Sequence, residues 1–133
     1  MRVFLDTNVL ASAFATRGIC ADILREVLAA HLLLASDQVL AELRRVLIGK
    51  FGVSSDLADE VAAFLRRAAV LVTPAAQVTA HLKDQDDLPI LSAAVQGWAD
   101  VVVTGDKELQ RLTSVGDVRI LSPREFWTEI AAR

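Results

Sequence analysis

The sequence contains no tyrosine, a single cysteine and no long apolar run, although 53% of its 133 residues are hydrophobic. One cysteine excludes an internal disulfide and a cysteine-rich metal site, and Cys20 is expected to be a small buried hydrophobe in a helix. No run approaches the ~20 apolar residues that a membrane span needs. The first segment is too short and too acidic for a signal peptide. We therefore expect a cytoplasmic protein with no membrane association.

Several catalytic signatures are also missing. There is no P-loop, no glycine fingerprint for a dinucleotide and no HExxH zinc motif. Neither histidine, His31 or His81, is paired with an obvious serine or cysteine nucleophile. Two tryptophans and no tyrosine leave little for a base-stacking surface. The net charge of −3 argues against nucleic acid at first sight, but a cation bound among the acids would reverse the local field.

Short apolar runs alternate with helical patterns along the whole chain. Strands are expected at 3–5, 32–35, 70–72, 101–103 and 118–121, and helices with a 3.6-residue period fill most of the intervals. Ser122-Pro123-Arg124-Glu125 has the residues of a capping box at the start of the last helix. Strands separated by helices predict an α/β fold, with a central parallel sheet of about five strands in three α/β/α layers. We expect residues 1–133 to form one domain.

Four acidic residues stand out by their positions. Asp6 and Asp106 follow the first and fourth strands, at the carboxyl edge where parallel sheets bind ligands. Asp87 sits at a helix N-terminus, and Glu42 falls about 40° beyond the edge of the apolar stripe of its helix. For Asp6-Thr7-Asn8 alone, a helix cap is as good an interpretation as a binding site.

Together, however, the four acids are hard to explain as caps. Carboxylates held close together repel one another unless a cation lies between them. Their oxygens are hard ligands suited to Mg²⁺ or Mn²⁺, which can activate water against a phosphodiester. The residues therefore favour metal-dependent phosphodiester hydrolysis, with one or two ions.

Four motifs in this order resemble the PIN domain family. They are Leu5-Asp6-Thr7-Asn8, Ala41-Glu42-Leu43, the stretch from Asp84 to Leu91, and the stretch from Val103 to Leu109. The resemblance covers essentially the whole chain and is closest to small single-domain proteins akin to the VapC toxins of toxin–antitoxin pairs. It implies a ribonuclease of α/β/α architecture that uses Mg²⁺ or Mn²⁺, a small antitoxin protein as partner, and a homodimer.

The resemblance also implies roles for individual residues. Asp6, Glu42, Asp87 and Asp106 match the catalytic and metal-binding acids, and Asn8 and Thr104 match polar residues that orient them. Glu108 stands where the family often has an aspartate, so whether it contributes is left open, as it is for Asp84 and Asp86. Lys83, Lys107, Arg17 and Arg44 flank the acidic motifs and are candidates for contacting RNA phosphates.

Three other functions remain open at this point. The domain could be a binding or regulatory module with weak or no nuclease activity, or a nuclease of RNA processing rather than a toxin. A phosphatase with Asp6 as nucleophile is disfavoured, because the second aspartate that such enzymes use two residues later is replaced by Asn8.

Overall fold

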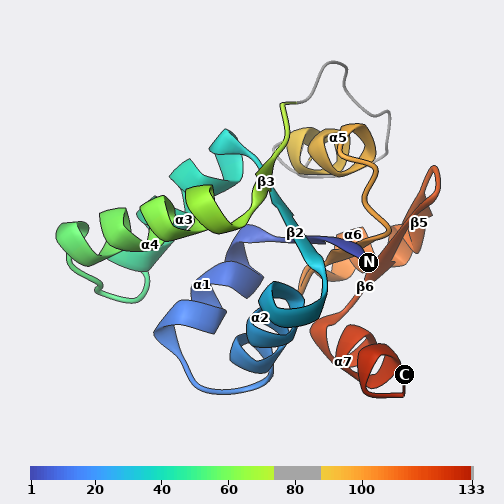
Figure 1. The fold of residues 1–133 in the computed structure, drawn as a ribbon, viewed down its shortest axis with the longest axis horizontal. Coiled ribbons are helices and arrows are strands. Elements are labelled where there is room, and N and C mark those ends of the chain that lie inside the picture. The colour runs from blue at the N-terminus through green and yellow to red at the C-terminus, as the bar shows by residue number, and fades with distance from the viewer. Residues whose placement is uncertain (74–87, 133) are drawn as a thin grey trace.

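The computed structural model describes residues 1–73 and 88–132. Strands are separated by one or two helices, as the apolar pattern predicted, except where β5 adjoins β6 (Figure 1). The strands are β1 (Arg2–Leu5), β2 (Leu32–Ala35), β3 (Val70–Leu71), β4 (Val101–Val103), β5 (Ser114–Val115) and β6 (Val118–Leu121). The helices are α1 (Thr7–Ala15), α2 (Ile19–Ala30), α3 (Asp37–Gly49), α4 (Ser55–Ala68), α5 (Leu88–Gln96), α6 (Lys107–Leu112) and α7 (Pro123–Ala131).

The strands form one sheet in the order β3-β2-β1-β4-β6-β5. The first five pair in parallel, with Leu5 opposite Val103 where β1 meets β4. β2 and β3 lie on one side of β1, and β4, β6 and β5 lie on the other side. The strand order therefore reverses between β1 and β4, which is where open α/β sheets bind their ligands.

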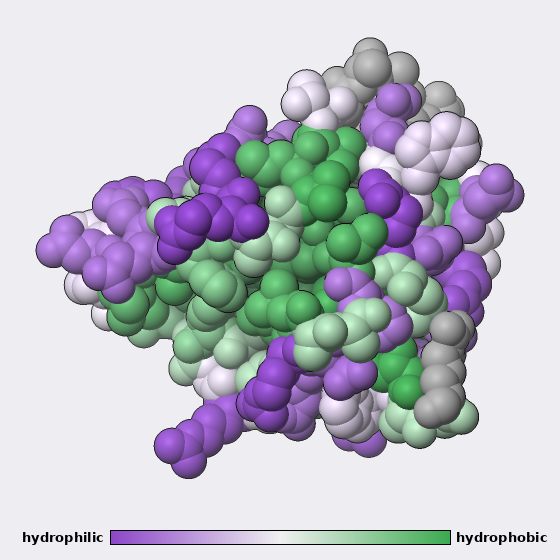
Figure 2. Space-filling model, in the orientation of Figure 1, coloured by the Kyte–Doolittle hydropathy of each residue, from purple (hydrophilic) through white to green (hydrophobic). Residues whose placement is uncertain are grey.

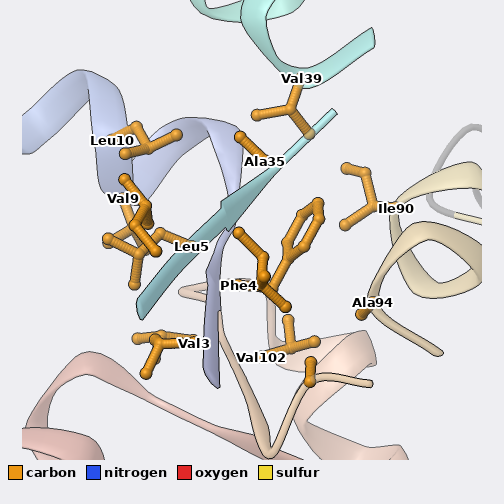
Figure 3. Close-up of a cluster of buried hydrophobic side chains, with 14 of the residues drawn as sticks. Val3, Phe4, Leu5, Val9, Leu10, Ala35, Val39, Ile90, Ala94 and Val102 are labelled. Carbon is orange, nitrogen blue, oxygen red and sulfur yellow. The ribbon is translucent and has the colours of Figure 1, made fainter. Parts of the chain in front are cut away.

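Helices cover both faces of this sheet, so the predicted α/β fold in three layers is confirmed. Figure 3 shows Phe4 of β1 pointing toward Ile90 and Ala94 of α5, while Val3 and Leu5 lie on the side of α1. This alternation follows from the two-residue period of a strand. The side chains of Val3, Phe4 and Leu5 are completely buried. On the α1 side, α2 packs against α1 and α7.

The sheet differs from the prediction at one edge. The sixth strand, β5, is antiparallel to β6 and only two residues long, too short to show an apolar period. It is joined to β6 by Gly116-Asp117, and Gly116 has a φ of +57°. A glycine at positive φ in a two-residue loop is the usual signal of a hairpin, so this strand was detectable from its turn.

Helix starts agree closely with the sequence. Ser36, Ser54 and Ser122 each accept a hydrogen bond from the first turn of α3, α4 and α7. The Glu125 carboxylate in turn accepts a hydrogen bond from the Ser122 backbone N–H, which completes the predicted capping box. Phe126 of α7 lies fully buried in the core.

Apolar residues also reach the surface. Figure 2 shows hydrophobic residues gathered over the middle of the visible face, with polar residues around them. Among the larger exposed hydrophobic side chains are Leu57 and Phe64 of α4, and the Phe64 ring packs edge-on against Phe14 of α1 with centroids 6.3 Å apart. Within the described ranges, none of the helices is both long enough and apolar enough to cross a membrane.

Candidate active site

The carboxyl ends of β1 and β4 are held side by side beyond the last paired residues of the strands. The Asp6 backbone N–H donates to the Val103 carbonyl at 3.0 Å, and the Thr104 N–H donates to the Leu121 carbonyl of β6 at 3.0 Å. These bonds continue the parallel ladder by one residue on each strand. Asp6 and Thr104 are therefore fixed against each other at the point where the strand order reverses.

Thr104 connects two of the predicted acids through one hydroxyl group. Its Oγ1 donates to Asp6 Oδ2 at 2.6 Å and accepts from the Asp106 backbone N–H at 3.0 Å. Thr104 is completely buried, and its carbonyl accepts a further hydrogen bond from the Gln110 side chain. The hydroxyl thus fixes the orientation of the Asp6 carboxylate.

The two aspartates have different relations to the helices that follow them. Asp6 occupies the N-cap position of α1, but its side chain makes no capping hydrogen bond there. Asp106 does cap α6, because its Oδ1 accepts from the backbone N–H groups of Glu108 and Leu109. The Asp6 side chain is therefore not a helix cap. The Asp106 side chain is a cap, and it also lines the cavity described below.

Asp6 is only 7% exposed, and its surroundings disfavour its negative charge. Burial is the largest cause that raises its pKa above the ordinary value, and the charges of Asp106 and Glu42 raise it further. The Thr104 hydroxyl, which donates to Asp6, and the neighbouring Thr7 backbone N–H lower this pKa. In the described part of the chain, none of these three acids forms an ion pair with a basic side chain.

Glu42 reaches the same region from α3. It is half-buried, as its place beside the apolar stripe predicted, and its Oε2 accepts from the Thr7 hydroxyl at 3.1 Å. Gln38, one turn earlier in α3, donates to its Oε1 at 3.3 Å. A threonine that follows Asp6 directly therefore orients the helix acid, a role the sequence analysis did not assign to Thr7.

These side chains line one cavity of about 780 Å³. Its lining residues come from the end of β1, from α1, α3 and α5, and from the turn after β4. In full, the described lining is Asp6, Thr7, Asn8, Glu42, Arg45, Val46, Gly49, Lys50, Ile90, Gly105 and Asp106. The acids that follow β1 and β4 and the acid of α3 thus face a space large enough for part of a polymeric substrate.

Several predicted residues lie elsewhere or make other contacts. Asn8 lines the cavity but is exposed, and among the described residues it makes no hydrogen bond to a carboxylate. Glu108 and Lys107 do not line the cavity. Arg44 forms an ion pair with Asp59 of α4 instead of facing the acids.

Other predicted residues lie outside the described ranges. Asp84, Asp86, Asp87 and Lys83 belong to residues 74–87. The roles proposed for them therefore stay predictions. Ile90 of the same motif lies in α5 and lines the cavity.

The basic side of the cavity was missed by the sequence analysis. Arg45 of α3 and Lys50 at its C-terminal cap contribute it, and neither was among the basic residues predicted to contact RNA. The signal was present in the helix period, because positions 42, 45, 46, 49 and 50 fall on one side of an α-helix.

The donor set fits a hard divalent cation in its chemistry. All three acids offer oxygen ligands, and a cation would offset the charge repulsion at the buried Asp6 carboxylate. Within 1–73 and 88–132, however, no three Asp, Glu, His or Cys side chains lie close enough together to form a metal-binding group as they stand. A complete site therefore needs a further ligand or a closer approach of these side chains.

Comparisons with known proteins agree with this architecture. The family model described as PIN domain matches residues 2–108. VapBC2 from Rickettsia felis, solved with a DNA fragment from its promoter, superposes with a TM-score of 0.65 and 16% identity, covering 92% of this chain and 98% of the other. VapBC-1 from nontypeable Haemophilus influenzae gives 0.65 and 24%, covering 93% and 99%. The PIN domain endonuclease Utp24 gives 0.54 and 23%, covering 91% and 84%. No curated protein matches the sequence.

Proposed function

The chain belongs to the PIN domain family, and on this premise we propose that it is a metal-dependent endoribonuclease, the toxin of a toxin–antitoxin pair. The observation that carries the nuclease proposal is the convergence of Asp6, Glu42 and Asp106 on one cavity at the strand-order reversal. The similarity to two VapBC structures supports the toxin assignment through the fold. An endonuclease among the similar structures supports the reaction class.

We propose that Asp6 and Asp106 hold Mg²⁺ or Mn²⁺ together with Asp87, and that Glu42 completes the site or holds a second ion. The bound ion supplies Lewis-acid polarisation of the phosphodiester and a nucleophile at neutral pH. Thr104 fixes the Asp6 carboxylate and Thr7 fixes the Glu42 carboxylate. These hydroxyls fix the orientation of two of the carboxylates that would hold the cation.

The partners follow from the same proposal. The substrate is single-stranded or loop RNA, cleaved to 5′-phosphate and 3′-hydroxyl ends. A small antitoxin protein binds the toxin and suppresses it, and the toxin acts as a homodimer in the cytoplasm.

The decisive experiment measures cleavage of a single-stranded RNA with Mg²⁺ or Mn²⁺ and with a chelator. Asp6→Asn, Asp87→Asn and Asp106→Asn are expected to lower kcat/KM at least about a hundredfold, as for the loss of one preorganised electrostatic group. Glu26→Gln, an exposed carboxylate of α2 away from the cavity, is the matched control and should retain full activity. Circular dichroism verifies that every variant is folded.

The outcomes separate the alternatives. Cleavage that persists with the chelator, or an Asp6→Asn variant as active as the parent, would contradict the metal-carboxylate mechanism. Inactivity of every form with all RNAs tested would favour the binding module. Growth arrest on expression that is relieved by a co-expressed neighbouring small protein supports a toxin, whereas normal growth with an active enzyme favours RNA processing.

A further inference from the structure

The second half of α3 forms one wall of the acidic cavity and carries its basic side chains. Arg45, Val46, Gly49 and Lys50 line the cavity next to Glu42. Positions 45 and 50 are five residues apart, which corresponds to about 7.5 Å along a helix axis. The two positions are also about 140° apart around the axis, so their long side chains reach separate points of the cavity, as contacts to two phosphates of one strand require.

Arg45 differs sharply from its neighbour Arg44. The Arg44 guanidinium is paired with Asp59 of α4, with Nε 2.7 Å from the carboxylate oxygen. Arg45 is exposed on the cavity side and, within the residues that the structure describes, takes part in no ion pair, even with Glu42 one turn earlier. The contrast leaves the Arg45 guanidinium available for an external anion.

Lys50 lies at the C-terminal cap of α3, at the other end of the wall. Its ammonium lies 5.6 Å from the centre of the Phe51 ring, and among the described residues no carboxylate pairs with it. The ring supports the ammonium without neutralising it. Two positive charges therefore stand along the cavity wall.

Between them, Gly49 leaves the wall without a side chain. A Cβ built at this position meets no atom within 4 Å, so packing does not require glycine. Helix termination does not require it either, because Gly52, with a φ of +67°, provides the left-handed residue of the turn after α3. Glycine is a poor helix former, so its presence inside the last turn calls for another reason.

We propose that this row is the track for the substrate backbone: Arg45 and Lys50 bind two neighbouring phosphates of single-stranded RNA, and Gly49 gives the strand room to pass. This inference rests on the proposed ribonuclease function and assigns the residues that bind its substrate. It also predicts little base preference at this wall. The described lining of the cavity contains no aromatic ring on which a base could stack, and backbone contacts carry no sequence information.

The test is the salt dependence of RNA binding, measured by fluorescence anisotropy with a labelled oligouridylate and a chelator present. All proteins carry Asp6→Asn, which prevents cleavage during the measurement. For a single strand, each phosphate contact contributes about 0.7 to the slope of log K against log salt. We expect Arg45→Gln and Lys50→Gln each to reduce the steepness of this salt dependence by about 0.7, and the double variant to reduce it by about 1.4. Arg44→Gln, which removes a paired arginine on the same helix, should leave the slope unchanged.

The same variants without Asp6→Asn are then assayed for cleavage with Mn²⁺, where Arg45→Gln should raise KM more than it lowers kcat. Slopes of the Arg45 and Lys50 variants that equal that of Arg44→Gln would overturn the proposal, as would an absence of measurable binding by the parent. Altered slopes in a protein that never cleaves RNA would uphold the track and refute the nuclease function. The two proposals therefore fail separately.

Gly49→Leu supplies an independent readout. Leucine is a better helix former than glycine and its side chain would project into the track, so thermal stability should rise while RNA affinity falls at least tenfold. A Gly49→Leu variant that binds RNA like the parent would show that the strand does not pass this residue. A merely structural glycine would change stability without changing binding.

Discussion

Thr104 is the residue at which the fold and the candidate site can be tested together. Its hydroxyl donates to the Asp6 carboxylate at 2.6 Å and accepts from the Asp106 N–H at 3.0 Å. Thr104→Val keeps the shape of this completely buried side chain and removes the hydroxyl alone. The substitution therefore isolates the polar interaction from packing.

The expected loss of stability follows from these two bonds. A hydrogen bond to a charged group contributes about 1.5–3 kcal/mol, and the half-buried Asp106 N–H that loses its acceptor adds up to about 1 kcal/mol. The free energy of unfolding should therefore fall by about 2–4 kcal/mol. For a chain of 133 residues, each kcal/mol corresponds to about 3–5 °C, so Tm should fall by about 6–20 °C.

Thermal and urea denaturation of four proteins test this reasoning: the parent, Thr104→Val, Asp6→Asn and the double variant. Asp6→Asn replaces the charged acceptor by a neutral amide. Thr104→Val should therefore cost at least about 1 kcal/mol less in the Asp6→Asn background than in the parent. Thr104→Ser, which keeps the hydroxyl, is the matched control. A loss below about 0.5 kcal/mol, or equal losses in both backgrounds, would refute the assigned role of the hydroxyl.

The pH dependence of that loss has a definite sign. The hydroxyl favours the ionised form of Asp6, whose pKa in the folded protein is nevertheless raised by burial. The penalty of Thr104→Val should be largest at neutral pH and should shrink as pH falls through the raised pKa of Asp6, where the carboxyl becomes protonated. A penalty that does not change with pH would mean that the hydroxyl does not act on the charge.

Three further predictions concern stability. The raised pKa of Asp6 means that its ionised form destabilises the fold, so stability is lost as pH rises through that pKa. Asp6→Asn should therefore raise Tm at neutral pH in the absence of divalent cations. Saturating Mn²⁺, followed by differential scanning fluorimetry, should stabilise the parent but not this variant. The hydrogen bond from the Ser122 backbone N–H is the chief cause that lowers the pKa of Glu125. The stability that ionised Glu125 contributes is therefore present above the ordinary pKa near 4.5 and is lost as pH falls through the lowered pKa. Glu125→Gln should make the free energy of unfolding less dependent on pH in acid. Phe126→Ala, at a completely buried position, should cost about 3–5 kcal/mol in urea denaturation, and a cost below about 1 kcal/mol would contradict its place in the core.

The elements of the fold were largely predictable because their signals are local. Apolar runs bounded by polar residues predicted β1, β2, β4 and β6, and serine caps marked where three helices begin. The short β5 strand was missed, since pairing with β6 and not an apolar pattern stabilises it. Its turn glycine was the only local sign of it.

The candidate site was predictable in part. The position of Asp6 and Asp106 after two parallel strands was enough to expect them at one edge of the sheet, and the rotation of Glu42 on α3 placed it beside the core. The role of Thr7 was not predictable, because it depends on how α3 packs across α1. The basic residues were misjudged for a similar reason: adjacent arginines on one helix point in different directions, and only the position of α4 decides which of them is paired.

The sequence by itself determined which segments form strands and helices, that the acids lie at strand ends and on helix faces, and the capping box of α7, because these features depend on residues within a few positions of one another. Only the tertiary structure decided that β1 and β4 are neighbours, that one buried hydroxyl holds Asp6 and contacts the Asp106 backbone, and that Arg45, not Arg44, faces the cavity. Those features depend on contacts between segments about 100 residues apart or between helices, and no local pattern specifies which partner a side chain meets.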